Sequence, residues 1–533
     1  MRFTRPEIHR FIYFFGLTVF AASLVLSNYF MSLAQWLLVL NLFAGGRYAE
    51  KLKRLWANKG ALLIIGILLL HALGLLWSQD LDYALKDLRV KLPILVLTFI
   101  MAAEEPLSRK RLHGVLLVHL LAVTAGSIVI TYRIYGLGIT DARDASILIS
   151  HIRFALNLCT AIFALIWLQT QKPLYPLILR IAGWVWLCWL LLFLFFLQSA
   201  TGFALFLITG TAMLLRAFYL RARKPWKVAV SVFLLLSATA FVSLAVMLYR
   251  DAGDADEHGN LHLEYITPYG NPYVHNLENP QKENGHYLWM YVCFEEMDSA
   301  WSLRSAIPFD SLGKTGEEIR YTLVRYLSSK GLRKDFDAVM GLGQDEITAI
   351  ESGVANVNEL EAPGLHRRLT NLVWELQDYA YTGDPRNHSM MQRVELWKAS
   401  LRIVADEPFC GVGTGDVPSA FGEELKAMNS SISDTGLRAH NQYLAIAVAF
   451  GIPGLLYFLF ALFYAPVRKR RLNSYLFLSF FIIGMLSMIT EDTLESQAGV
   501  SFFIFFYALL MFAADDRKPD EGQPVPKFKR SSG

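Results

Sequence analysis

The sequence predicts an all-α polytopic membrane protein with about twelve transmembrane helices and one large, mostly helical extracytoplasmic loop. The first observation is composition: hydrophobic residues make up 54% of the 533 positions and charged residues only 18%. Soluble domains carry about 25% charged residues, so the chain is too apolar for that class. The second observation is the pattern, in which apolar runs recur along the chain and one long polar segment precedes the last three of them.

Each predicted span is an apolar run close to the ~20 residues that a helix needs to cross a hydrocarbon core of ~30 Å. The fourth run is short and is counted together with its flanks. No small-residue cleavage site follows the first run, which indicates a retained helix rather than a signal peptide. The runs lie at 11–27, 28–45, 60–77, 92–103, 112–132, 151–170, 179–197, 201–219, 228–248, 443–465, 474–490 and 499–514.

Basic residues in alternate loops predict the orientation, because cytoplasmic loops are enriched in Lys and Arg. They precede the first run and follow the second, fourth, eighth and tenth runs. Both termini are then cytoplasmic, and the polar segment lies outside. The expected regions are an N-terminal membrane domain at 1–248, a large loop domain at 249–442, a C-terminal membrane domain at 443–515 and a disordered cytoplasmic tail at 516–533.

The polar segment is predicted to be mostly helical from Glu317 onward, where apolar residues recur at three and four positions. Further helices are expected at 343–357, 365–380 and 390–405, after an irregular stretch that ends near Glu278. An extracytoplasmic location would permit a disulfide between Cys293 and Cys410, which the sequence does not establish. No Cys/His ligand spacing occurs, so no metal site is predicted.

The placement of ionisable residues separates the possible function classes. A transporter is expected to place charges or broken helices near mid-membrane, whereas here the interiors of the predicted spans are nearly free of charge. Polar groups gather instead at the outer ends of the spans, which favours an enzyme that acts at the membrane surface on a lipid-linked substrate. The basic residues report topology and do not form a surface typical of nucleic-acid binding.

His440 stands just before the run 443–465 and is the candidate general base, because an imidazole titrates near pH ~6.5 and can accept a proton at neutral pH. A structural histidine is the alternative. Glu491, Asp492 and Glu495 follow the eleventh run. The plain interpretation is a polar turn, and the functional alternative is that they pair with an arginine or orient His440. Arginines suit phosphate groups because the guanidinium fork binds two oxygens, although a membrane anchor or a solvated side chain is the plainer reading. The candidate arginines are Arg153, Arg393, Arg402 and Arg438.

The glycine-rich stretch GVGTGD at 411–416 matches neither the dinucleotide fingerprint nor the P-loop, so nucleotide binding is disfavoured. An outer-face site has no access to ATP or nucleotide sugars. The energy for a transfer reaction must therefore be stored in the substrate, as it is in a sugar attached to a lipid pyrophosphate.

Two motifs resemble the O-antigen ligase and polymerase superfamily of bacterial membrane glycosyltransferases. RVELWKASLRIVADEPFCGVGTGD at 393–416 is similar to that family's Arg-x-x-x-Trp helix followed by Pro and a Gly-x-Gly run. RAHNQYLAIAVAFGIPGLLYF at 438–458 is similar to its His-Asn/Ser-x-Tyr-Leu motif followed by Gly-x-x-Gly. The order of spans around one large outer loop also agrees, although residues 255–390 resemble no shared motif.

This resemblance implies a GT-C-like fold and an inverting glycosyltransferase of the inner membrane that needs neither metal nor cofactor. It implies transfer of a glycan from undecaprenyl pyrophosphate to an acceptor in the periplasm, with the lipid A-core oligosaccharide favoured. His440 would be the catalytic base, and Arg393 and Arg153 would hold the pyrophosphate. The expected substrate-binding residues are Arg438, Arg402, Asn441, Tyr443 and Glu491. Polymerisation, protein O-glycosylation and, from another class, a flippase for the same lipid-linked glycan are the alternatives.

Overall fold

The computed structural model describes residues 4–137, 139, 142–170, 176–197, 199–221, 263–276, 278–279, 281–313, 317–358, 374–386 and 388–514. The chain divides into two compact units. Unit 1 comprises Met1–Arg221, Leu396–Asn429 and Ser433–Gly533, and unit 2 comprises Ala222–Glu395 and Ser430–Ile432.

Unit 1 is a helical bundle to which both ends of the chain contribute. Its N-terminal elements are α1 (Arg5–Leu26), α2 (Asn28–Ala44), α3 (Tyr48–Ala57), α4 (Lys59–Leu73), η1 (Gly74–Leu76), α5 (Leu81–Ala103), α6 (Arg109–Leu137), α7 (Ala142–Ala145), α8 (His151–Thr170), α9 (Leu177–Phe196) and α10 (Ala200–Arg221). Its later elements are most of α18 (Ser389–Asp406), α19 (Val417–Ala427), α20 (Gln442–Arg468), η2 (Arg471–Asn473), α21 (Tyr475–Thr490), η3 (Thr493–Glu495), α22 (Gln497–Ala508) and η4 (Leu509–Ala513).

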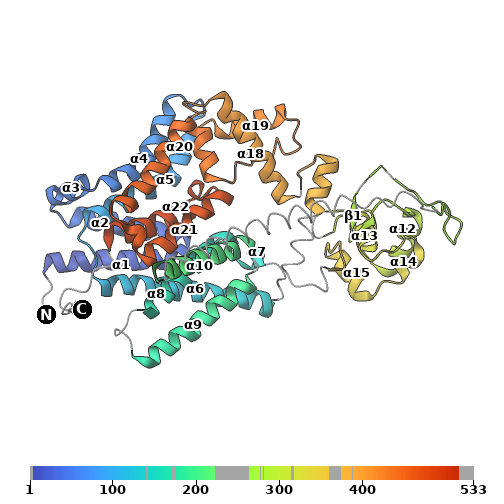
Figure 1. The fold of residues 1–533 in the computed structure, drawn as a ribbon, viewed down its shortest axis with the longest axis horizontal. Helices are drawn as coiled ribbons and strands as arrows, with labels where there is room; N and C mark the ends of the chain where they lie inside the picture. Colours follow the sequence, from blue (N-terminus) through green and yellow to red (C-terminus); the bar gives the residue numbers. More distant parts are fainter. Residues whose placement is uncertain are drawn as a thin grey trace. The chain divides into compact units, whose positions relative to one another are not determined.

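The last helices of the chain pack among the first ones. In Figure 1 the red helices α20 and α22 lie beside the blue helices α4 and α5, and direct contacts join α22 to α5 and α20 to α4. Phe20 of α1 stacks on Phe505 of α22 with ring centroids 5.0 Å apart, and both are fully buried. The bundle is therefore one hydrophobic core, which brings α5, α8, α20 and the α21–α22 turn into one body.

Fewer helices of the described residues qualify as candidate membrane spans, by length and composition, than the sequence predicts. Eleven of the twelve predicted runs lie in the described residues and coincide with helices, and 228–248 lies outside them. Among the described residues, seven helices are long and apolar enough to cross a membrane, or eight if α2 and α3, bent by 116°, form one broken span. The two apolar helices at Tyr475–Thr490 and Gln497–Ala513 are shorter. The chain is thus a multi-pass membrane protein, and twelve spans stay a prediction.

Helix α20 is broken at Gly451, whose φ of 66° and ψ of −171° are not helical. The break frees backbone groups, and the glycine-rich loop satisfies them: Val412 N–H donates to Val448 O and Gly413 N–H to Ala449 O, both at 2.9 Å. Ile452 N–H donates to Pro408 O at 2.8 Å. The GVGTGD stretch is therefore a brace for the broken helix, since these N–H groups are not left to cradle a phosphate.

Unit 2 has a core of its own. It contains β1 (Lys282–Glu283) and β2 (His286–Tyr287), which pair antiparallel, followed by α12 (Phe294–Arg304), α13 (Ile319–Ser329), α14 (Phe336–Met340), α15 (Gln344–Glu351) and the start of α18. Trp301 and Tyr326 are its largest fully buried side chains. A buried ion pair joins Arg325 Nε to Glu283 Oε1 at 2.8 Å.

Three of the helices predicted in the polar segment match α13, α15 and α18. The helix expected at 365–380 is seen at 374–382, and its earlier part lies outside the described residues. Helices α12, α14 and α19 were not predicted. Cys293 is buried and Cys410 is exposed. The two cysteines belong to different units, and a disulfide between them stays a prediction.

Candidate functional site

Polar side chains from four elements of unit 1 meet at one end of the bundle. They come from the segment before α20, the turn between α21 and α22, the first turn of α8 and the N-terminal half of α5. Helix caps fix the starts of α20 and α22. The Asn441 side chain accepts from Tyr443 N–H at 3.0 Å and Leu444 N–H at 3.2 Å, and Ser496 caps α22.

His440 lies in this cluster in a strained backbone conformation. Its φ of 45° is in the left-handed region, which residues with a Cβ adopt rarely. The Trp397 indole of α18 donates to the carbonyl of the preceding residue, Ala439, at 2.9 Å. Nδ1 of His440 is buried without a hydrogen-bond partner among the described residues and lies 4.0 Å from Asp492 Oδ1, while a third of the side chain is exposed. The imidazole is thus held near a carboxylate and remains reachable from solvent.

Glu491 and Asp492 end α21 beside this histidine. One ligand-capable atom each of His440, Glu491 and Asp492 lies within 4.8 Å of the others, so these three residues could hold a metal ion. Burial raises the pKa of the Asp492 carboxyl, and the nearby Arg438 opposes that rise. The charge of Arg153 also acts on Asp492, so a cation of the protein already competes for these carboxylates.

Arg153 in the first turn of α8 is buried, with 8% of its surface exposed. Its Nη1 has no hydrogen-bond partner in the part of the chain that the structure describes, although Glu491 and Asp492 are close enough to stabilise its charge. A Cβ on Gly499 would lie 3.0 Å from the guanidinium carbon, so only a glycine leaves room for it at the start of α22. A buried guanidinium with an unused donor is suited to binding an anion.

Arg438 is fixed by three contacts. Its Nη1 donates to Tyr83 Oη at 2.8 Å and lies 3.5 Å from Glu495 Oε2, and its Nε lies 3.8 Å from Asp492 Oδ2. Burial alone would lower the pKa of this guanidinium, but Glu495, Tyr83 and Asp492 outweigh it and raise the pKa. Arg438 therefore stays charged at the edge of the cluster.

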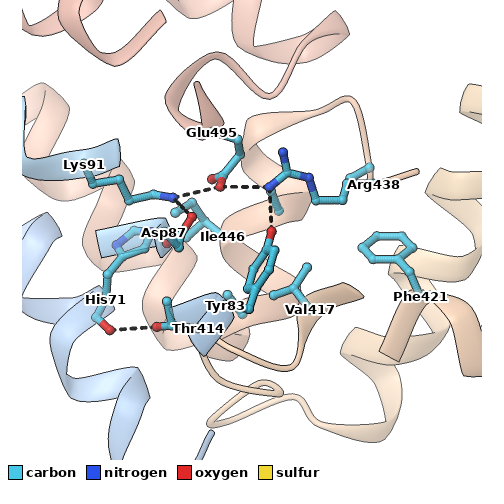
Figure 2. Close-up of a pocket in the computed structure, with 13 residues that line it drawn as sticks. His71, Tyr83, Asp87, Lys91, Thr414, Val417, Phe421, Arg438, Ile446 and Glu495 are labelled. Carbon is cyan, nitrogen blue, oxygen red and sulfur yellow. Dashed lines mark hydrogen bonds and ion pairs between the residues drawn. The ribbon is translucent and has the colours of Figure 1, made fainter. Parts of the chain in front are cut away.

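Lys91 continues this network into the bundle (Figure 2). Its ammonium group is 1% exposed and lies 2.7 Å from Glu495 Oε2 and 2.5 Å from Asp87 Oδ1. Gln442 donates to Glu495 Oε1 at 3.1 Å and accepts from Leu494 N–H at 2.6 Å. Burial alone would raise the pKa of Glu495, but Lys91 and Arg438 outweigh it and lower the pKa. Glu495 therefore stays ionised between two cations.

A pocket with about 390 Å³ of empty volume, partly open to solvent, adjoins this network. Figure 2 shows Tyr83, Lys91, Glu495 and Arg438 among the residues of its wall, linked by hydrogen bonds and ion pairs. Apolar side chains of α19, Val417 and Phe421, form another part of the wall. A polar wall that faces an apolar one suits an amphiphilic ligand.

Sequence reasoning missed Tyr83, Asp87, Lys91 and His71 in this wall. The predicted fourth span begins at 92, so the charged residues just before it belong to its polar flank rather than to a site. The available signal was an Asp87/Lys91 pair at i,i+4 directly before an apolar run, which places both charges on one helix face. Asp87 and Lys91 belong to the part of α5 that precedes the predicted run 92–103.

Four predicted site residues lie elsewhere or make structural contacts. Arg402 is exposed and pairs with Glu424 on α19 at 3.3 Å. Tyr443 donates from its hydroxyl to Met485 O at 2.8 Å and so joins α20 to α21. Asn441 is the helix cap described above. Arg393 lies on the part of α18 that belongs to unit 2.

Residues 352–459 match the family model described as O-antigen ligase. The matched segment contains α18, the glycine-rich brace, His440 and the break in α20. No curated protein matches the chain. The motifs and the family model thus agree that the segment around residues 352–459 is similar to the O-antigen ligase family.

Proposed function

We propose that the chain transfers a glycan from undecaprenyl pyrophosphate to a sugar hydroxyl of the lipid A-core oligosaccharide. One observation carries this proposal: the unpaired Nδ1 of His440 and the unpaired Nη1 of buried Arg153 flank the same carboxylates, Glu491 and Asp492. A potential base and an anion-binding group therefore lie at one end of the membrane bundle. Such a pair is what transfer from a lipid pyrophosphate requires.

His440 acts as the general base in this proposal. It takes the proton from the acceptor hydroxyl as that oxygen attacks the anomeric carbon of the donor sugar. The bond from this carbon to the pyrophosphate oxygen breaks, and its electron pair leaves with the lipid pyrophosphate. Displacement from the opposite side inverts the anomeric centre. Asp492, 4.0 Å from Nδ1, stabilises the imidazolium that forms.

Arg153 holds the pyrophosphate, and Arg438 supports it. The same role for Arg393, which belongs to unit 2, rests on the family motif alone and stays a prediction. Negative charge grows on the leaving oxygen during the reaction, so fixed cations favour the transition state over the bound donor. Arg153 is buried, and its charge is therefore less screened than that of a surface arginine. Loss of one such contact is expected to lower the rate by ~10²-fold or more.

The site is proposed to face the periplasm, with both termini in the cytoplasm and the predicted regions 1–248, 249–442, 443–515 and 516–533 as the domains. This placement follows from the basic loops. Nucleotides are absent from the periplasm, so a donor used there must store its energy in its own pyrophosphate bond.

Metal independence is part of the proposal, because arginines supply the positive charge that a divalent cation would otherwise bring. The three-residue cluster His440, Glu491 and Asp492 makes this testable. Purified protein that keeps its transfer activity in excess EDTA supports arginine catalysis. Activity that is lost in EDTA and restored by one divalent cation would assign the cluster to a metal.

The experiment that tests the function is complementation of a deletion strain, followed by electrophoresis of its lipopolysaccharide. A ligase defect leaves uncapped lipid A-core while lipid-linked polymer accumulates, whereas a polymerase defect leaves cores that carry one repeat. Arg153→Gln should reproduce the ligase defect, and Arg180→Gln on α9 is the matched control. A single-repeat pattern would reassign the acceptor, and normal ladders from Arg153→Gln at normal expression would contradict the site.

A further inference from the structure

A second polar cleft lies at the other end of α5 from the candidate site. Tyr83 at the start of α5 contacts Arg438, whereas Glu104 follows its end and lines this cleft. A helix of 23 residues is roughly 35 Å long, which is enough to cross a bilayer. The cleft has about 910 Å³ of empty volume, partly open to solvent. It is distinct from the candidate site and independent of the proposed function.

The lining of this cleft carries more positive than negative charge. Arg10, Arg47, Lys51 and Arg111 contribute four cations, against the carboxylates of Glu104 and Glu105. Glu104 Oε1 forms an ion pair with Lys51 Nζ at 2.7 Å. Glu105 is shared among arginines, because it pairs with Arg10 and lies 3.6 Å from Arg47. Internal pairing therefore leaves positive charge in the cleft.

Two groups in the lining have polar capacity that the described residues do not use. The Tyr13 hydroxyl is buried, with 4% of the residue exposed, and has no hydrogen-bond partner. The Arg111 guanidinium has no ion pair among the described residues and lies 5.9 Å from the centroid of the Phe14 ring. A buried hydroxyl without a partner costs free energy, so an acceptor supplied by a ligand is expected here.

Helix α3 beside the cleft has the side-chain pattern of a helix that lies at a membrane surface. Its exposed side chains Tyr48, Leu52 and Trp56 recur every four residues and form one apolar stripe, whereas Lys51 and Leu55 face inward. The helix is bent by 116° from α2, so it turns away from the direction of that span. Short amphipathic helices with aromatic residues lie along the membrane surface at the depth of the lipid headgroups.

We infer that this cleft binds the phosphate group of an anionic phospholipid. In this arrangement Arg111 and Arg47 contact the phosphate oxygens, Tyr13 donates to one of them, and the apolar stripe of α3 contacts the adjoining acyl chains. By the predicted orientation this is the cytoplasmic leaflet, where basic pockets between helices bind lipid headgroups. Membrane anchoring and headgroup recognition would then share one face of the bundle.

The test is lipid binding to the full chain, purified and delipidated in a neutral detergent. Thermal unfolding is followed during titration with phosphatidylglycerol, with phosphatidylcholine and with inorganic phosphate. Phosphatidylglycerol should raise the unfolding temperature at concentrations at which the other two do not. Arg111→Gln is expected to weaken the apparent affinity about 10-fold, and Tyr13→Phe should weaken it by a smaller factor. Lys110→Gln removes an exposed charge next to Arg111 and should bind as the wild type does.

Three outcomes would overturn the inference. Equal stabilisation by phosphatidylcholine would show that the cleft does not recognise the negative charge of the headgroup. Equal stabilisation by inorganic phosphate would make this a site for a free anion rather than a lipid. Unchanged phosphatidylglycerol affinity in Arg111→Gln and Tyr13→Phe, with unfolding temperatures like the wild type when no lipid is present, would place lipid binding elsewhere.

Discussion

Arg438 donates a 2.8 Å hydrogen bond to the hydroxyl of Tyr83, and this contact joins the segment before α20 to the first turn of α5. The two residues are far apart in sequence, yet together they set where Arg438 lies relative to His440. We expect Tyr83→Phe to lower kcat/KM about 5-fold without changing the fold, since one hydrogen bond to a charged group is lost. A double-mutant cycle with Arg438→Lys checks this, because additive effects would show that the contact does not position the arginine.

Lys91 neutralises two buried carboxylates, Asp87 and Glu495. Lys91→Met should destabilise unit 1 by about 3–5 kcal/mol, because both carboxylates then remain buried with one fewer cation. Thermal unfolding in detergent measures this, and Lys86→Met, an exposed lysine on the same helix, is the control. Equal unfolding temperatures for the two variants would contradict the role given to the network.

Gly451 is required by both conformation and space. Its φ is 66°, and a Cβ would lie 2.6 Å from Pro408 O. We predict that Gly451→Ala destabilises the protein by ~2 kcal/mol or more and lowers its expression. Gly422→Ala on α19, where a Cβ would come no closer than 3.9 Å to Ser433 O, should leave stability unchanged or slightly higher. A Gly451→Ala variant as stable as Gly422→Ala would show that the break in α20 is not fixed.

The His388–Asp378 pair predicts a pH dependence in unit 2. The Asp378 carboxylate lies 2.6 Å from His388 Nε2 and raises the pKa of this histidine above its ordinary 6.5. The stabilisation is therefore complete below pH ~6.5 and is lost as the pH rises through the folded-state pKa. Hydrogen exchange of residues 374–386 should be faster in His388→Gln than in the wild type at low pH, and the difference should shrink as the pH rises. A difference that does not depend on pH would contradict the pairing.

The sequence predicted the helices well where a long apolar run was the signal, as for α6, α8 and α20. For α5 it predicted only the part from 92 onward, because Asp87 and Lys91 interrupt the hydropathy. The ion pairs of Lys91 with Asp87 and Glu495 explain how these charges are buried. Glu495 is hundreds of positions away from Lys91 in the sequence, so no local pattern shows this pairing.

For the candidate site, residue type and motif identified His440, Arg153 and Arg438 but not the different roles of their neighbours. Asn441 and Tyr443 belong to the same motif, yet their side chains make a helix cap and an interhelical hydrogen bond. The glycine-rich loop likewise has the composition of a phosphate loop, but its N–H groups pair with the carbonyls of Val448 and Ala449. Hydrogen-bond partners decide these roles, and they depend on tertiary structure.

The central claim is that His440 is the base of a glycan transfer reaction. The most direct measurement is the rate of transfer from a purified lipid pyrophosphate glycan to an acceptor by His440→Gln, compared with the wild type in the same detergent. We predict a rate at least ~10²-fold lower, with donor binding retained, because only proton abstraction is removed. Transfer by His440→Gln within a few-fold of the wild-type rate would contradict the claim.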